Sequence, residues 1–83
     1  MKDALSTRMF LGLCKNRLSQ GLSTDQMYYW TAGAADAAES GTLLEHYARK
    51  FAEFLIETRS PPEALEALEA LEADFEAKLA EKV

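Results

Sequence analysis

The sequence predicts an all-α fold, a compact four-helix bundle with short connections. Helix start and stop signals divide the chain into four segments with helical patterns. Its 83 residues are too few for more than one domain, which therefore covers residues 1–83. Strand-forming residues are scarce, because valine and isoleucine occur once each. Short connections favour antiparallel neighbours. The predicted helices cover about residues 3–19, 24–39, 43–58 and 61–82.

The first two segments meet at Gly21, a residue suited to the left-handed conformation that follows many helices. Ser23 and Gln26 have the spacing of a capping box, which predicts that the second helix begins at residue 24. Leu22 and Met27 flank this cap at the spacing of a hydrophobic staple, which fixes the direction in which the chain enters the helix.

Two further capping boxes are predicted. The second helix is expected to stop at the Ser-Gly pair at 40–41, after which Thr42 and Glu45 start the third helix. Ser60, two prolines and Glu63 form the strongest start signal, because proline is already fixed in a helical φ at the first position.

The third segment has a clearly amphipathic pattern. At ~100° per residue its apolar side chains gather on one side, which predicts a buried face. Glu45 and Arg49 lie on the other side, spaced for an i,i+4 ion pair. The predicted buried residues are Leu43, Leu44, Tyr47, Ala48, Phe51, Phe54 and Leu55.

The fourth segment carries three Glu-Ala-Leu repeats at residues 63–71. The repeat has a period of three residues and the helix one of about 3.6, so identical residues drift around the axis. The leucines still fall within one apolar stripe, which we call the leucine seam. Glu69, Glu72 and Glu76 gather along one flank of this seam and are called the acidic border. This border is either a solubilising edge of a packing helix or a recognition edge for a basic partner. The leucine seam consists of Leu65, Leu68, Leu71, Phe75 and Leu79.

The first segment is apolar around well over half of its circumference, more than one neighbouring helix covers. Such a helix is usually central in its bundle or shared with a second subunit. We therefore predict a homodimer, formed through this helix or through the leucine seam. The expected dimer-interface residues are Leu5, Met9, Phe10, Leu11 and Leu18.

Charge argues against a general affinity for nucleic acid or anionic membranes, because 14 acidic and 9 basic residues give a net charge of -5. The charge is unevenly placed. Residues 1–22 hold four basic residues against one acid, whereas residues 60–83 hold seven acids against two lysines. This polarity favours binding between copies of the chain or to a positive surface.

Residues for chemistry are few. A single histidine, His46, and a single cysteine, Cys14, supply neither a metal cluster nor a nucleophile with its base. We expect no enzyme, with no catalytic residue, cofactor, metal or small-molecule substrate. Cys14 is expected to be a core residue, and its lack of a disulfide partner favours a cytoplasmic location. No apolar run has the roughly 20 residues of a membrane span.

The expected function is that of a small acidic, non-catalytic interaction protein that regulates or inhibits a protein partner by occupying its functional surface. In composition alone the chain resembles the small inhibitors encoded by phages and mobile elements, including anti-CRISPR and anti-restriction proteins. The acidic border implies a protein partner with a basic surface. The expected partner-binding residues are Tyr28, Tyr29, Glu69, Glu72 and Glu76.

The alternative is a dimeric helix-turn-helix-like regulator that binds nucleic acid. Residues 13–33 would place two helices around a turn at Gly21, as in that motif. The second of these helices contains no lysine or arginine, although contacts to phosphates supply most non-specific affinity.

Overall fold

The computed structural model describes residues 2–58 and 60–81, and its secondary structure in these ranges consists of α-helices without strands. The predicted all-α class is therefore confirmed. The predicted end of the last helix at residue 82 lies outside the described residues. The helices are α1 (Lys2–Ser19), α2 (Thr24–Ala37), α3 (Leu43–Glu57) and α4 (Pro61–Glu81).

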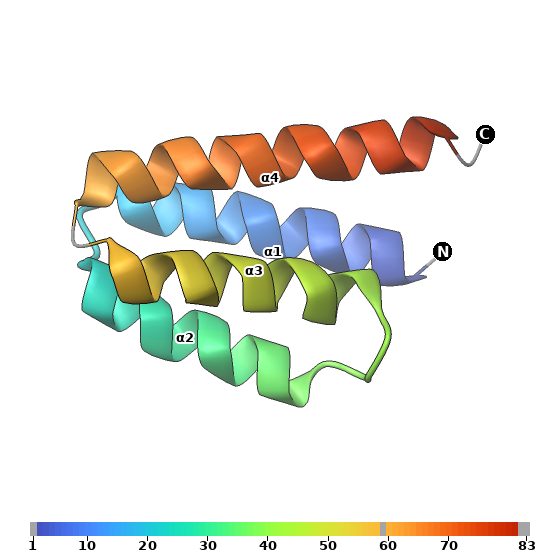
Figure 1. Cartoon of the computed structure of the whole chain (residues 1–83), viewed down its shortest axis with the longest axis horizontal. Helices are drawn as coiled ribbons and strands as arrows, with labels where there is room; N and C mark the ends of the chain where they lie inside the picture. Colours follow the sequence, from blue (N-terminus) through green and yellow to red (C-terminus); the bar gives the residue numbers. More distant parts are fainter. Residues whose placement is uncertain (1, 59, 82–83) are drawn as a thin grey trace.

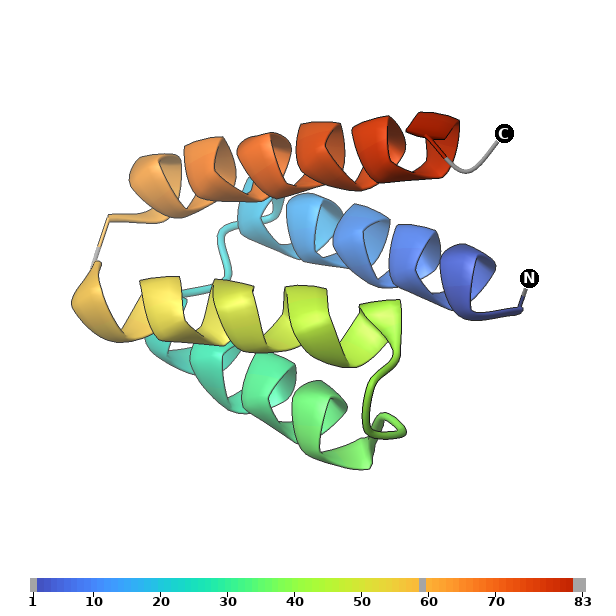
Figure 2. The same ribbon diagram turned by 45° about the vertical axis from the view of Figure 1, so that its right-hand side comes forward.

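Two parallel helices, α1 and α3, lie side by side in the middle of the molecule (Figure 1). Helices α2 and α4 run in the opposite direction, and α4 packs against both central helices whereas α2 packs mainly on α3. The second view shows α2 and α4 on opposite sides of the central pair (Figure 2). The molecule measures 36 × 23 × 20 Å, with the helices along its longest axis.

The core is centred on α3, whose Tyr47, Ala48 and Phe51 are fully buried. This is the face predicted from the helical pattern, with Ala52 added where α2 approaches closely. The Tyr47 ring meets that of Phe75 on α4 edge to face at 5.6 Å. The other buried apolar residues are Phe10, Leu11, Cys14, Leu18, Met27, Ala35, Leu55, Ala64 and Leu68.

The first turn of α3 is capped by a residue from the start of α1. The backbone N–H groups of Leu43 and Leu44 donate to the Asp3 carboxylate at 2.8 and 3.2 Å. The Thr42 hydroxyl accepts from the Glu45 N–H at 3.2 Å. Three of the N–H groups that a helix start leaves without partners are thereby satisfied. Asp3 thus joins the starts of both central helices.

The predicted helix signals are met to different degrees. Ser23 forms the complete capping box, with both reciprocal hydrogen bonds present. In the other two boxes the hydroxyl half forms but the glutamate turns to a neighbour. Glu45 accepts from the Gly41 N–H, and Glu63 accepts from the Thr58 hydroxyl, each at 2.9 Å. Helices α2 and α3 also end slightly earlier than predicted, because the residues after them are already extended.

The Asp3 cap predicts a measurable contribution to stability. Asp3→Ala is expected to lower the free energy of unfolding by about 1 kcal/mol, the usual cost of removing an N-cap side chain. Urea denaturation followed by far-UV circular dichroism measures this loss. Glu66→Ala on the exposed side of α4 removes the same charge and serves as the control. An equal effect of both variants would contradict the capping role of Asp3.

Candidate functional site

Tyr28 and Tyr29 of α2 and Ile56 of α3 form an exposed apolar surface, which we call the tyrosine face. The exposed fractions are 75% for Tyr29 and 63% for Ile56, whereas Tyr28 is half-buried against the edge of the core. The two tyrosine rings pack edge to face, with their centroids 5.7 Å apart. An exposed cluster of large apolar side chains is a frequent mark of a binding surface.

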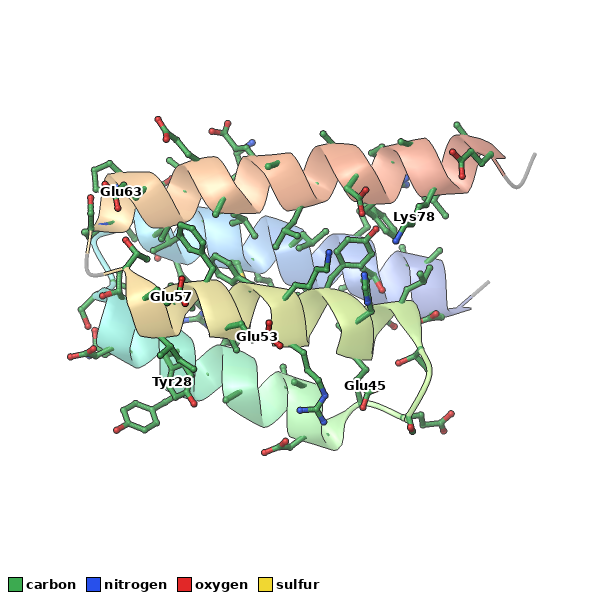
Figure 3. The ribbon with its side chains drawn as sticks, in the orientation of Figure 1. Tyr28, Glu45, Glu53, Glu57, Glu63 and Lys78 are labelled. Carbon is green, nitrogen blue, oxygen red and sulfur yellow. The ribbon has the colours of Figure 1, made fainter. Side chains whose placement is uncertain are left out.

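The tyrosine face borders two open hollows between α2 and α3, of about 290 and 250 Å³. Tyr28 and Ile56 line both of them, and Glu53 of α3 lines the second together with Tyr28 of α2 (Figure 3). The second hollow has room because small residues line it where the helices meet. These residues are Ala32, Ala35 and Ala52.

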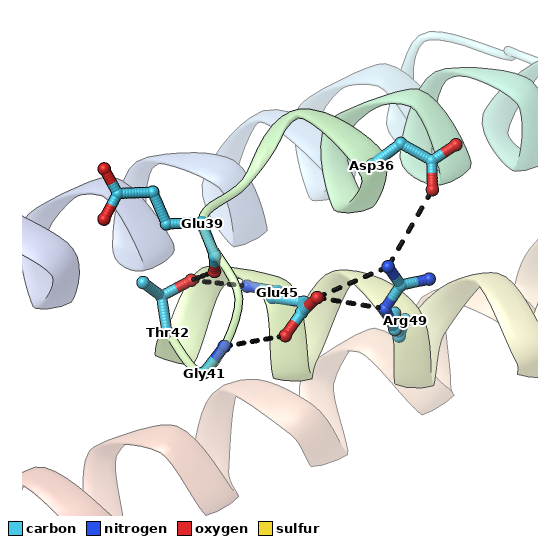
Figure 4. Close-up of polar contacts among 6 residues, drawn as sticks. All are labelled: Asp36, Glu39, Gly41, Thr42, Glu45 and Arg49. Carbon is cyan, nitrogen blue, oxygen red and sulfur yellow. Dashed lines mark hydrogen bonds and ion pairs between the residues drawn. The ribbon is translucent and has the colours of Figure 1, made fainter.

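Most of the described charged residues that line these hollows are acidic. Asp25 lines the first hollow, and Asp36, Glu53 and Arg49 line the second. Arg49 already lies between two acids, 3.3 Å from Glu45 and 3.9 Å from Asp36 (Figure 4). Among the described residues Glu53 makes no hydrogen bond or ion pair. Glu53 beside the second hollow therefore favours a partner that brings positive charge.

Glu45 holds Arg49 in this position and is itself held at the start of α3. The Gly41 N–H, which donates to Glu45 at 2.9 Å, and secondly Arg49 lower the pKa of the Glu45 carboxyl below its usual value. Gly41 has a φ of 85°, in the left-handed region that suits glycine. The predicted ion pair between Glu45 and Arg49 is confirmed, and it extends to α2 through Asp36.

The acidic border lies along the contact between α4 and α1. Arg8 donates to both carboxylate oxygens of Glu76, at 2.9 and 3.2 Å. Lys15 lies 3.6 Å from Glu72 and 4.0 Å from Glu69. The basic first helix and the acidic last helix thus meet within one chain. All these pairs are partly solvent-exposed, so each stabilises the fold by less than about 1 kcal/mol.

The five predicted partner-binding residues fall on two separate surfaces. Tyr28 and Tyr29 lie on α2, whereas the acidic border lies on α4, on the opposite side of the central pair (Figure 2). A single compact epitope cannot include both groups. The border already has cations of its own chain beside it, and the tyrosine face has open space beside it.

Of the five predicted dimer-interface residues, three are buried in the core and two are exposed. Phe10, Leu11 and Leu18 are buried in the core of the single chain, so they cannot cover a second subunit while the chain keeps this fold. Their apolar pattern is explained by packing within the molecule, in which α1 is one of the two central helices. Leu5 and Met9 remain on the surface, with about 60% of each residue exposed.

Cys14 and His46, the two residues considered for catalysis or metal binding, both pack against other side chains of the fold. Cys14 is fully buried, and burial raises the pKa of its thiol to about 12, so the thiolate is scarce at neutral pH. His46 is exposed and packs edge-on against the Tyr47 ring at 5.0 Å. Within residues 2–58 and 60–81 no group of three or more potential ligands could hold a metal ion. None of the helices described there has the length and apolar character to cross a membrane.

The helix that would read DNA in the alternative function is α2, and its exposed side chains include Asp25, Tyr29 and Asp36. Helix α2 has no lysine or arginine that could contact a phosphate backbone. The geometry therefore gives no support to the helix-turn-helix alternative.

Sequence reasoning missed Ile56 and Glu53 as surface partners of the tyrosines. A signal was available in the helical spacing, because Arg49, Glu53 and Ile56 follow one another at i, i+4 and i+7 on the polar side of α3. An isoleucine on an otherwise charged side has no place in the core. The spacing does not show which residue lies beside Ile56, since only the packing of α2 on α3 brings Tyr28 next to it.

Compared with known proteins, the chain matches no protein-family model, no curated protein and no solved structure.

The lowered pKa of Glu45 predicts a pH dependence of stability. Its carboxylate stabilises the fold fully above the ordinary pKa of glutamate, and this contribution disappears as the pH falls through the lower folded-state pKa. Glu45→Gln is therefore expected to be less stable than the unchanged protein at neutral pH and equally stable in strong acid. Urea denaturation across this pH range measures the difference. Glu53→Gln on the same helix is the control, and a convergence of the same size for both variants would contradict this assignment.

Proposed function

We propose that this protein is a small non-catalytic interaction protein that regulates or inhibits a protein partner by occupying the partner's functional surface. The observation that carries the proposal is the tyrosine face, with Tyr28, Tyr29 and Ile56 beside two open hollows. Aromatic residues next to a recess are typical of the centres of protein interfaces, where a few residues supply most of the binding energy.

The partner's contact segment is proposed to be basic and apolar. An apolar side chain of the partner would fill a hollow beside Tyr28, and a lysine or arginine next to it would pair with Glu53, which has no ion pair among the described residues. The acidic border, Glu69, Glu72 and Glu76, is proposed as a secondary electrostatic edge. There a partner's cations would compete with Arg8 and Lys15.

The composition supports one form of this function, an inhibitor carried by a phage or another mobile element and acting in the cytoplasm. The proposal also includes a homodimer. Support for it comes from α1, because Leu5 and Met9 of the predicted interface remain exposed after the helix has taken its central place in the core. A dimer formed on α1 leaves the tyrosine face of α2 and α3 free for the partner.

Affinity capture from lysate of the native host, followed by mass spectrometry, tests the proposal. The unchanged protein is expected to recover a specific protein, and the double variant Tyr29→Ala, Ile56→Ser is expected to recover at least about tenfold less of it, as for hot-spot residues. Both changed side chains are exposed, so far-UV circular dichroism should show unchanged helicity.

The control variant is Glu66→Ala, which changes an exposed side chain of α4 outside the tyrosine face, the acidic border and the predicted dimer interface. It is expected to recover the partner as well as the unchanged protein does. Recovery of no specific partner would contradict the proposed function. Equal recovery by the double variant would contradict the assignment of the tyrosine face.

A further inference from the structure

The two hollows beside the tyrosine face follow one another along the line where α2 packs on α3. Tyr28 and Ile56 line both hollows and lie between them. Thr58, just after α3, lines only the first hollow, whereas Ala32 and Ala52 line only the second. The hollows therefore form one continuous recess between the two helices, which we call the α2–α3 groove.

The two hollows of the α2–α3 groove lie little more than one helical turn apart. Their lining residues are centred about four to five positions apart along each helix, or roughly 6–8 Å at a rise of about 1.5 Å per residue. The hollows measure about 290 and 250 Å³, and a cavity of roughly 150 Å³ holds a benzene molecule. The groove thus has room for two large apolar side chains that a partner presents one turn apart.

The walls of the α2–α3 groove offer few backbone groups to a partner. Both walls are helices, and the N–H and C=O groups inside a helix are bonded to one another. An extended segment lying in the groove would leave its own backbone groups without partners against an apolar surface. A helical segment satisfies its own backbone and presents the side chains at i and i+4 about 6 Å apart on one face. The groove therefore suits a helix.

Glu53 places a negative charge on the α3 wall of the groove, opposite Tyr28 on the α2 wall (Figure 3). Among the described residues it makes no hydrogen bond or ion pair. Arg49 lines the same hollow, but it already lies between Glu45 and Asp36. A lysine or arginine of a partner that reaches this hollow would therefore find Glu53 as its counter-ion.

We propose that the α2–α3 groove binds a basic amphipathic helix of the protein partner. Apolar side chains at i and i+4 of that helix occupy the two hollows, and a lysine or arginine beside the second of them pairs with Glu53. Tyr29 and Ile56 at the exposed rim add apolar contact, and the small side chain of Ala32 lets the partner helix approach closely. This inference rests on the proposed function and names the form of the partner's contact segment.

Selection from a phage-displayed library of random peptides, each long enough for about three helical turns, tests the inference. The unchanged protein is expected to enrich peptides with large apolar residues at i and i+4 and a lysine or arginine beside the second. The double variant Tyr29→Ala, Ile56→Ser is the control target and is expected to enrich none of them. Far-UV circular dichroism of an enriched peptide is expected to show a gain of helix on binding.

Two pairs of matched variants locate the bound peptide, with its Kd measured by fluorescence anisotropy. Ala32→Leu fills the second hollow and is expected to weaken binding at least about tenfold, whereas Ala37→Leu, at the exposed end of α2, is expected to leave it unchanged. Glu53→Gln is expected to weaken binding about threefold, as for an exposed ion pair. Glu57→Gln changes an exposed acid of α3 that lines neither hollow and is expected to have no effect. The circular dichroism of each variant should match that of the unchanged protein.

Each contrary outcome overturns a stated part of the inference. A selected motif with apolar residues at i and i+2 would indicate an extended segment and overturn the helix. Equal enrichment by the double variant, or equal weakening by Ala32→Leu and Ala37→Leu, would overturn the groove. Sedimentation that shows a dimer dissociated by Ala32→Leu would place a second copy of the chain in the groove instead of a partner.

The proposed function is tested separately by capture from the native host. A captured protein that is lost with the double variant but retained by Ala32→Leu would leave the proposed function standing and overturn the helix in the groove. Recovery of no specific protein would overturn both.

Discussion

The carboxylate of Asp3 joins the starts of the two parallel central helices, α1 and α3, on which the other two helices pack. Parallel helices bring together the positive ends of their dipoles, which repel each other unless a negative group lies between them. Asp3 supplies that group at the start of α1 and caps α3 with it. Helices α2 and α4, which run the other way, then pack on the central pair from opposite sides.

Most of the fold is predictable because its signals are local. The capping serine at residue 23, the glycine turn at residue 21 and the amphipathic pattern of α3 lie within single segments, and they place the helices to within about two residues. The Asp3 cap is not predictable in this way, since it joins residues 40 positions apart. The charge difference between the two ends of the chain is visible in the sequence, but its neutralisation through Arg8 and Glu76 requires the three-dimensional packing.

The candidate surfaces were also predictable only where they depend on local sequence signals. Helical periodicity identifies Tyr28 and Tyr29 as lying off the core face, but it does not show that Ile56 lies beside them. The pattern of α1 shows an excess of apolar residues without showing which of them the chain itself uses. The structure assigns Phe10, Leu11 and Leu18 to the core and leaves Leu5, Met9 and Leu13 outside. A sequence pattern thus predicts how much of a helix is apolar, whereas packing decides which of its apolar side chains remain exposed to solvent.

The pairing of α1 with α4 has a consequence for the order in which the chain folds. Arg8 and Glu76 are 68 positions apart, whereas α2 and α3 are joined by residues 38–42 alone. Closing a loop costs entropy that grows with its length, so the hairpin of α2 and α3 is cheaper to form than the α1–α4 contact. The tyrosine face lies entirely on this hairpin. The surface proposed for partner binding therefore lies within a single hairpin, whose formation closes a shorter loop than the α1–α4 contact does.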